Sequence, residues 1–184
     1  MDSASNTPGK GESPASDSTN LVGRRIPSLS FSSTRGKTIN LADTALGNYV
    51  LFIYPRTGRP DRPEAAEWAL IPGAKGCTAE SCEFRDLAAG YAGIGFSIFG
   101  LSTQSASEQG EAADRLHLPY TLLSDPEMEL GHRCALDHFS YERSTLYKRC
   151  TLVVCDGVLA QAHLDIADPT SHPRELLAFL KRVR

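Results

Sequence analysis

Residues 49–54 read Tyr-Val-Leu-Phe-Ile-Tyr, an unbroken apolar run that Pro55 ends. Runs of this length with β-branched and aromatic side chains are typical of strands that are buried on both faces of a sheet. The runs at 95–101 and 151–154 have the same character. We therefore expect these three segments to form the centre of one sheet, with 49–54 as its first strand.

The end of the chain predicts a hairpin and a final helix. Asp156-Gly157 is a strong turn signal that leads into a strand over 158–163. In the last helix a proline and an acidic residue come first, and apolar side chains recur on one face; the residues concerned are Pro173, Glu175, Leu176, Leu180 and Val183.

Three more helices are predicted between the strands. They cover 78–91, the region around 108–116, and a segment that starts at 124–127, where Ser-Asp-Pro-Glu has the spacing of a capping box. Strands that alternate with helices imply a mainly parallel sheet, to which the late hairpin adds an antiparallel part. The predicted fold is α/β and thioredoxin-like, with a central mixed β-sheet flanked by helices.

The composition is that of one ordinary globular domain. The 184 residues are 41% hydrophobic and 22% charged, enough for one core and too few for two comfortable domains. Residues 1–20 are rich in Ser, Pro, Gly and Asp, so we expect a disordered tail ahead of a domain at 21–184. A formal net charge of -3 argues against nucleic acid or an anionic membrane as the main partner.

Cysteine usage indicates a reducing compartment. The chain has five cysteines, an odd number, with neither a signal-peptide pattern nor an apolar run of membrane-spanning length. A cytoplasmic location is therefore expected. The cysteines and five histidines lack the Cys-x-x-Cys and His-x(3–5)-His spacings of a closed zinc site, so no metal is predicted.

Cys77 and Cys82 stand five residues apart where the helix at 78–91 is expected to begin. The N-terminus of a helix favours the thiolate of a cysteine, and the thiolate is the nucleophile. Five helical residues rise by roughly 7.5 Å and turn by about 500°, so the two side chains lie on different faces. A disulfide between them would require the first turns to unwind, because its Cα atoms must lie within about 7 Å.

Three motifs together resemble the peroxiredoxins of the Q type, also called bacterioferritin comigratory proteins. They are Tyr54-Pro55, the run GCTAESCEFRD at 76–86, and RCTLVV at 149–154. The resemblance covers the chain from about Leu21 to its end. It implies a thiol-dependent peroxidase without a bound cofactor, acting as a monomer or weak homodimer.

The resemblance also implies a role for each matching residue. Cys77 matches the peroxidatic cysteine, which attacks a hydroperoxide and becomes a sulfenic acid. Cys82 matches the resolving cysteine, whose disulfide with Cys77 is reduced by a thioredoxin- or glutaredoxin-like donor. Arg149 matches the active-site arginine, which holds the thiolate and stabilises charge on the peroxide. Substrate-binding positions fall on Tyr54, Gly76, Thr78 and Glu80, although Glu80 could simply cap its helix.

Two departures from the family pattern stand close to the motif. Ala74 and Lys75 replace the usual Thr-Pro, which removes a hydroxyl that normally contacts the peroxide. Residues 56–73 form a stretch where most relatives have only a few residues, and its composition predicts a surface loop. Trp68 in this stretch could pack over the Cys77 pocket and select bulky hydroperoxides, or could anchor the loop on the core.

Other interpretations of the thiols stay open. The same pair of cysteines could serve a redox sensor that changes a binding surface without efficient turnover. A general thiol–disulfide oxidoreductase would be expected to carry Cys-x-x-Cys, which is absent. Three further cysteines are expected in the core or sheet, with an alternative resolving role for one of them left open; they are Cys134, Cys150 and Cys155.

Overall fold

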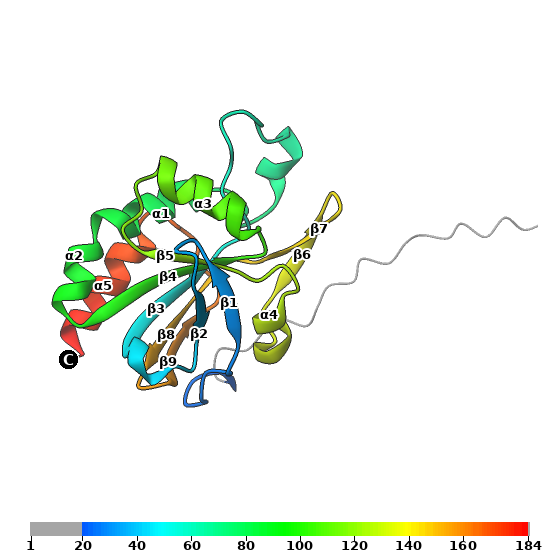
Figure 1. Ribbon diagram of the computed structural model, residues 1–184. Helices are drawn as coiled ribbons and strands as arrows, with labels where there is room; N and C mark the ends of the chain where they lie inside the picture. Colours follow the sequence, from blue (N-terminus) through cyan, green and yellow to red (C-terminus); the bar gives the residue numbers. More distant parts are fainter. Residues whose placement is uncertain (1–19, 184) are drawn as a thin grey trace, which may run out of the picture.

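The structure is a computed structural model that describes residues 20–183. The predicted tail, apart from Asn20, lies outside the described residues. One sheet of seven strands occupies the centre of the fold in the order β2-β1-β5-β4-β3-β8-β9 (Figure 1). Its strands are β1 Ser30–Ser33, β2 Thr38–Asn40, β3 Asn48–Ile53, β4 Phe96–Ser102, β5 Thr121–Ser124, β8 Cys150–Cys155 and β9 Val158–His163.

Three neighbouring strands, β3, β4 and β5, run parallel, and every other pairing in the sheet is antiparallel. This confirms the predicted mixed sheet and the three buried runs at its centre. The expectation of a mainly parallel sheet is wrong, because two of the six pairings are parallel and β1 and β2 add antiparallel pairs on the other side of the parallel strands. Because β8 runs against β3, the start of β8 lies beside the end of β3, and Cys150 pairs with Ile53. The residues that precede β8 and those that follow β3 therefore meet at one edge of the sheet.

Helices cover both faces of this sheet (Figure 1). Alternate residues of β3 point to opposite sides: Val50 and Phe52 belong to one core cluster, and Tyr49, Leu51 and Ile53 to the other. The first cluster is covered by α1 Cys77–Asp86, α2 Ala88–Gly93, α3 Ala106–Arg115 and α5 His172–Arg182. The second is closed by α4 Glu129–Cys134 and the antiparallel strands.

A separate hairpin stands beside the main sheet. It consists of β6 His138–Tyr141 and β7 Ser144–Tyr147. Residues 56–73 pack against it through a short 3-10 helix, η3 Ala66–Leu70; a second such helix is η2 Thr44–Leu46. The long segment that composition marks as a surface loop is mostly exposed, and Trp68 fixes it to the hairpin.

Some predicted helices need correction. The helix expected over 78–91 is two helices, because the chain breaks at Leu87, and α2 then turns so that Gly90 lies close against Leu177 of α5. The capping box expected at 124–127 does not form; Asp125 instead accepts hydrogen bonds from the backbone N–H groups of Glu129 and Leu130, so α4 begins later.

The last helix ends earlier than its apolar pattern suggests. Val183 terminates α5 and is 60% exposed, so it does not belong to the buried face of the helix. Leu177, which the predicted pattern did not include, is buried there. Five short strands have no strong sequence signal and are additions to the predicted set: β1, β2, β5, β6 and β7. Within residues 20–183, the structure contains no helix with the length and apolar character needed to cross a membrane.

Candidate active site

Cys77 is the first residue of α1, at the edge where β3 ends and β8 begins. Gly76 precedes it with φ 92°, a left-handed conformation that glycine adopts without strain. A Cβ at position 76 would lie 2.5 Å from Cγ of Pro169, so the loop before α5 closes directly over this turn. The Cys77 side chain is only 3% exposed. The sequence thus places the thiol at a helix N-terminus, as expected, but in a dry environment.

Arg149 comes just before β8 and is buried beside Cys77. Its Nη2 donates to Cys77 Sγ at 3.2 Å, and to the carbonyl oxygens of Lys75 at 2.9 Å and Gly73 at 3.2 Å. Its Nη1 forms an ion pair with Glu80 Oε2. The guanidinium is therefore held on several sides with one edge directed at the sulfur, a geometry that a flexible ammonium group could not reproduce.

Glu80 is fully buried one turn after Cys77. Burial raises its pKa to about 7, while the charge of Arg149 lowers it. Its Oε1 and the Nε of Arg149 have no hydrogen-bond partner among the described residues. Glu80 does not cap the helix, because its side chain is committed to Arg149. The capping interpretation of Glu80 is therefore wrong.

The protonation of Cys77 is set by opposing effects. Burial raises the pKa of its thiol, and the Glu80 charge adds to that rise. The charge of Arg149, its hydrogen bond, and a backbone hydrogen bond from Arg56 lower the pKa. The thiol also donates a hydrogen bond to the carbonyl oxygen of Ala74 at 3.5 Å. Burial outweighs these contacts, so the pKa of the Cys77 thiol is raised, and the charge of Arg149 is the main effect that opposes the rise.

The remaining predicted positions differ in how they relate to the sulfur. Tyr54 is buried in the same core cluster as Cys77, but its hydroxyl donates to Gln109 Oε1 at 2.7 Å. Gln109 in turn donates to backbone carbonyls of Gln104 and Leu123. Thr78 is half-buried, one residue after Cys77. Sequence reasoning missed Gln109, since nothing local distinguishes it from an ordinary surface glutamine of a helix.

The chain before Cys77 contributes through its backbone. The carbonyl oxygens of residues 73, 74 and 75 face Arg149 or Cys77, so Ala74 and Lys75 take part without using their side chains. Sequence reasoning missed these contacts because a carbonyl leaves no residue signature. Trp68 packs against Phe139 and Tyr141 of the hairpin and against Ala74. It anchors the 56–73 segment on the hairpin and lies one packing layer from Cys77.

Cys82 occupies the second turn of the same helix and is only half-buried. Its neighbour Ser81 accepts a hydrogen bond on its carbonyl oxygen from the Tyr120 hydroxyl at 2.7 Å. Both Cys77 and Cys82 are free thiols. Burial raises the pKa of Cys134 and Cys150, and both thiols lie in the core on the opposite face of the sheet. Residues 20–183 hold no group of three or more His, Cys, Asp and Glu that could bind a metal.

Comparison with known proteins agrees with this arrangement. The Redoxin family model matches residues 21–178, most of the chain. The chain is 30% identical over 110 residues to Peroxiredoxin Bcp of Bacillus subtilis and 32% identical over 140 residues to Peroxiredoxin bcp1 of Schizosaccharomyces pombe, covering 60% and 70% of this chain. It spans 60% and 64% of the lengths of those two relatives.

A solved structure extends the similarity to the fold. Peroxidoxin BcpB from Mycobacterium tuberculosis superimposes with a TM-score of 0.72 at 25% identity, covering 89% of this chain and 98% of that one. The predicted thioredoxin-like fold is confirmed by this neighbour. The sequence motif, the family match and the shared fold lead to one conclusion: the chain belongs to the Redoxin family, and within it the chain is similar to the Bcp peroxiredoxins.

Proposed function

We propose that this protein is a thiol-dependent peroxidase in which Cys77 reduces hydrogen peroxide and organic hydroperoxides. The single observation that carries the proposal is the 3.2 Å contact between Arg149 Nη2 and Cys77 Sγ, two groups that are both buried. A fixed positive charge at a buried sulfur favours the thiolate over the thiol, and the thiolate is the nucleophile. The names of the relatives, all peroxiredoxins, support the same chemistry.

In the first step the Cys77 thiolate attacks the terminal oxygen of the hydroperoxide. The S–O bond forms as the O–O bond breaks, which leaves a sulfenic acid and an alkoxide that takes a proton to become water or an alcohol. Negative charge moves from the sulfur to the leaving oxygen during this step. Arg149 stabilises that charge because its guanidinium is already oriented and desolvated.

In the second step Cys82 attacks the sulfenic sulfur, water leaves, and an intramolecular disulfide forms. Both cysteines lie within the ten residues of α1, so this step requires part of the helix to unwind. Cys82 starts half-exposed, which suits the later approach of an external dithiol. A thioredoxin- or glutaredoxin-like donor of a reducing cytoplasm then restores both thiols, with the chain acting as a monomer or weak homodimer.

Intact mass and peroxide consumption test both steps. Wild-type protein given one equivalent of hydrogen peroxide should lose two mass units as the disulfide forms, and digestion should locate it between Cys77 and Cys82. Cys77→Ser should abolish peroxide consumption, and Cys82→Ser should complete one turnover and then stop. Cys155→Ser, at another half-buried cysteine, is the matched control and should keep both steps. Full turnover by Cys77→Ser would refute the assignment.

A further inference from the structure

Ser102, the last residue of β4, binds the chain where it leaves β3. Its side chain is buried, and its hydroxyl donates to the carbonyl oxygen of Pro55 at 2.9 Å. The same hydroxyl oxygen accepts a hydrogen bond from the backbone N–H of Gln104 at 3.2 Å. The hydroxyl is therefore fixed from both sides, and it holds the Pro55 carbonyl in one position.

Gln104 binds the next two peptide groups of the same segment. Its Oε1 accepts a hydrogen bond from the backbone N–H of Thr57 at 2.8 Å, and its Nε2 donates to the carbonyl oxygen of Thr57 at 3.4 Å. Gln104 is held in turn through its own carbonyl oxygen, which accepts from Gln109 Nε2 at 3.1 Å. Three consecutive peptide groups, from Pro55 to Gly58, are therefore held by the connection between β4 and α3.

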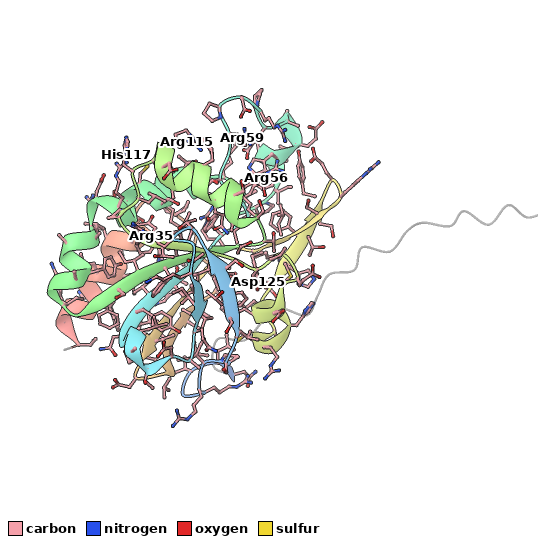
Figure 2. All side chains as sticks on the ribbon, viewed as in Figure 1. Arg35, Arg56, Arg59, Arg115, His117 and Asp125 are labelled. Atoms are coloured by element: carbon pink, nitrogen blue, oxygen red, sulfur yellow. The ribbon has the colours of Figure 1, made fainter. Side chains whose placement is uncertain are left out.

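Arg115 extends this set of contacts by one residue. It is the last residue of α3, its Nη2 donates to the carbonyl oxygen of Gly58 at 3.0 Å, and its ion pair with Glu111 helps to fix its position. Figure 2 shows Arg56 at the N-terminal end of α3 and Arg115 farther along the same helix. The path of the chain beyond β3 is therefore determined by α3 and by the connection that precedes it.

The N–H of Arg56 belongs to the first of these peptide groups. In a planar trans peptide the carbonyl oxygen and the N–H point in opposite directions. The donor at the Pro55 carbonyl, Ser102, therefore sets the direction of the Arg56 N–H, and that N–H hydrogen bonds to Cys77. A donor to the sulfur favours the thiolate, so this contact lowers the pKa of Cys77.

We propose that Ser102 is a positioning residue for Cys77, and that it holds the Pro55–Arg56 peptide group with its N–H aimed at the sulfur. The proposal rests on the peroxidase function and adds to it a residue outside the motifs that match the family. Arg149 supplies one donor to the sulfur through its side chain, and the Arg56 N–H supplies a second through the backbone. A donor that is oriented before the reaction stabilises the thiolate without reorganisation during it.

The test replaces Ser102 by alanine in the full-length reduced protein. Ser102→Ala removes the hydroxyl, so the Arg56 N–H is less well oriented toward Cys77. Oxidation of Cys77 by hydrogen peroxide should slow by about fivefold, the factor that corresponds to the loss of one hydrogen bond. The curve of Cys77 alkylation against pH should move to higher pH, because the thiolate loses part of its stabilisation. A role in folding stability alone would not move this curve.

Ser33→Ala is the matched control. Ser33 is also a buried serine whose hydroxyl donates to a backbone carbonyl, that of Lys37, and accepts from the backbone N–H two residues later. It lies on β1, three strands from β3 in the sheet. Ser33→Ala should therefore lose stability in urea to a similar extent and should keep the wild-type rate and pH dependence of Cys77.

A second variant tests the same segment from a half-buried position. Gln104→Met releases the two peptide groups that follow the Arg56 N–H and keeps the length of the side chain. It should slow oxidation of Cys77 by about twofold and move the alkylation curve in the same direction. If Ser102→Ala does not fold, this variant decides, and a wild-type rate and pH dependence in it would contradict the proposal.

The outcomes separate this inference from the peroxidase function. If Ser102→Ala is folded and keeps the wild-type rate and pH dependence, Ser102 does not position the N–H, and the peroxidase stands. The positioning role is also wrong if Ser33→Ala slows Cys77 to the same extent. If wild-type Cys77 does not react with hydrogen peroxide, the proposed function fails. The alkylation curves still test Ser102 in that case, because alkylation requires no peroxide.

Discussion

Cys77 and Cys82 lie on one helix, five residues apart, in opposite surroundings. Cys77 is buried, and its sulfur lies 3.2 Å from a guanidinium that is itself held by two carbonyl oxygens and Glu80. Cys82 is half-exposed, and the carbonyl oxygen of its neighbour Ser81 accepts a hydrogen bond from Tyr120. The first turn of α1 therefore holds a buried thiol beside a fixed charge, whereas in the second turn Cys82 is half-exposed although Ser81 and Phe84 beside it are buried.

The difference matches the two demands of the proposed cycle. Attack on a peroxide needs a nucleophile and a charge that are fixed before the reaction, because reorganisation costs free energy. Resolution needs the same helix to open so that the two sulfurs can meet. A structure that fixed both turns equally would be suited to the first step and would obstruct the second.

Loss of the guanidinium group at the first turn should produce the largest effect. Arg149→Lys keeps a positive charge but cannot contact Cys77, Glu80 and the carbonyls of residues 73 and 75 together. We expect oxidation of Cys77 to slow by about 10²–10³, as on removal of one donor that stabilises a developing anion. The pKa of Cys77 should rise further, since Arg149 is what opposes burial. Stopped-flow oxidation and alkylation of Cys77 across pH measure the two effects.

Lys148→Gln is the matched control for that variant. Lys148 precedes Arg149 but is exposed, and its fixed contact is a backbone hydrogen bond to Asp137, which glutamine retains. A wild-type rate in this control would show that the effect depends on the guanidinium. An Arg149→Lys protein that is folded by circular dichroism and reacts at the wild-type rate would contradict the role of Arg149.

The central strands and the N-terminal end of α1 are the parts of the fold that the sequence predicts well. The strand at 48–53, the strands of the late hairpin and the first turn of α1 carry strong local signals, and the motif at 76–86 matches its family residue by residue. Arg149 is predictable from the resemblance, and its position beside Cys77 follows from the antiparallel pairing of β8 with β3. The local sequence pattern and the strand topology therefore both indicate the position of the Cys77 sulfur.

Contacts made by the backbone or across long distances could not be predicted. The carbonyl oxygens that hold Arg149 come from residues whose side chains play no part. Gln109 reaches Tyr54 from 55 positions away in the sequence. The break at Leu87 depends on the close approach of Gly90 to α5, and the spacing of apolar residues within α1 does not indicate that contact. The β6–β7 hairpin is short and polar, so its strands lack the apolar pattern that marked the central sheet.

Burial of His172 should also give a measurable pH dependence of the folding stability. His172, at the start of α5, lies 3.0 Å from Thr151 Oγ1, and burial together with the charges of His163 and Arg149 lowers its pKa to about 4. In the unfolded chain it titrates near 6.5, so between these values the unfolded state binds more protons. Folding stability from this group is complete above pH 6.5 and decreases as the pH falls toward 4.

The full effect corresponds to about 3 kcal/mol for the fall from 6.5 to about 4. His172→Asn removes the titrating group, so the stability difference between wild type and variant should shrink as the pH is lowered from 7 to 4.5. Urea unfolding at several pH values measures this. Glu80 contributes with the opposite sign, because its raised pKa makes the folded state bind more protons between 4.5 and about 7. If the stability difference between wild type and His172→Asn stays constant over this range, burial does not lower the pKa of His172.

The smallest predicted effect concerns the second turn of α1, which carries Cys82. Tyr120→Phe removes the hydrogen bond to the Ser81 carbonyl and keeps the ring that packs edge-on against Phe52. Loss of one buried hydrogen bond costs about 1 kcal/mol, and if that bond holds the second turn closed, disulfide formation should accelerate by about fivefold. Oxidation of Cys77 should be unaffected, so rapid-quench mass analysis should show the sulfenic acid forming as before and disappearing sooner.

Tyr91→Phe separates local release from general destabilisation. Tyr91 is also buried, and its hydroxyl donates to the carbonyl oxygen of Pro173 at 2.6 Å, away from Ser81. It should lose a similar amount of stability without accelerating disulfide formation. If both variants speed resolution equally, the limiting motion is a loosening of the whole domain. If Tyr120→Phe alone does so, the second turn of α1 is the part that opens, and Tyr120 sets how readily Cys82 reaches Cys77.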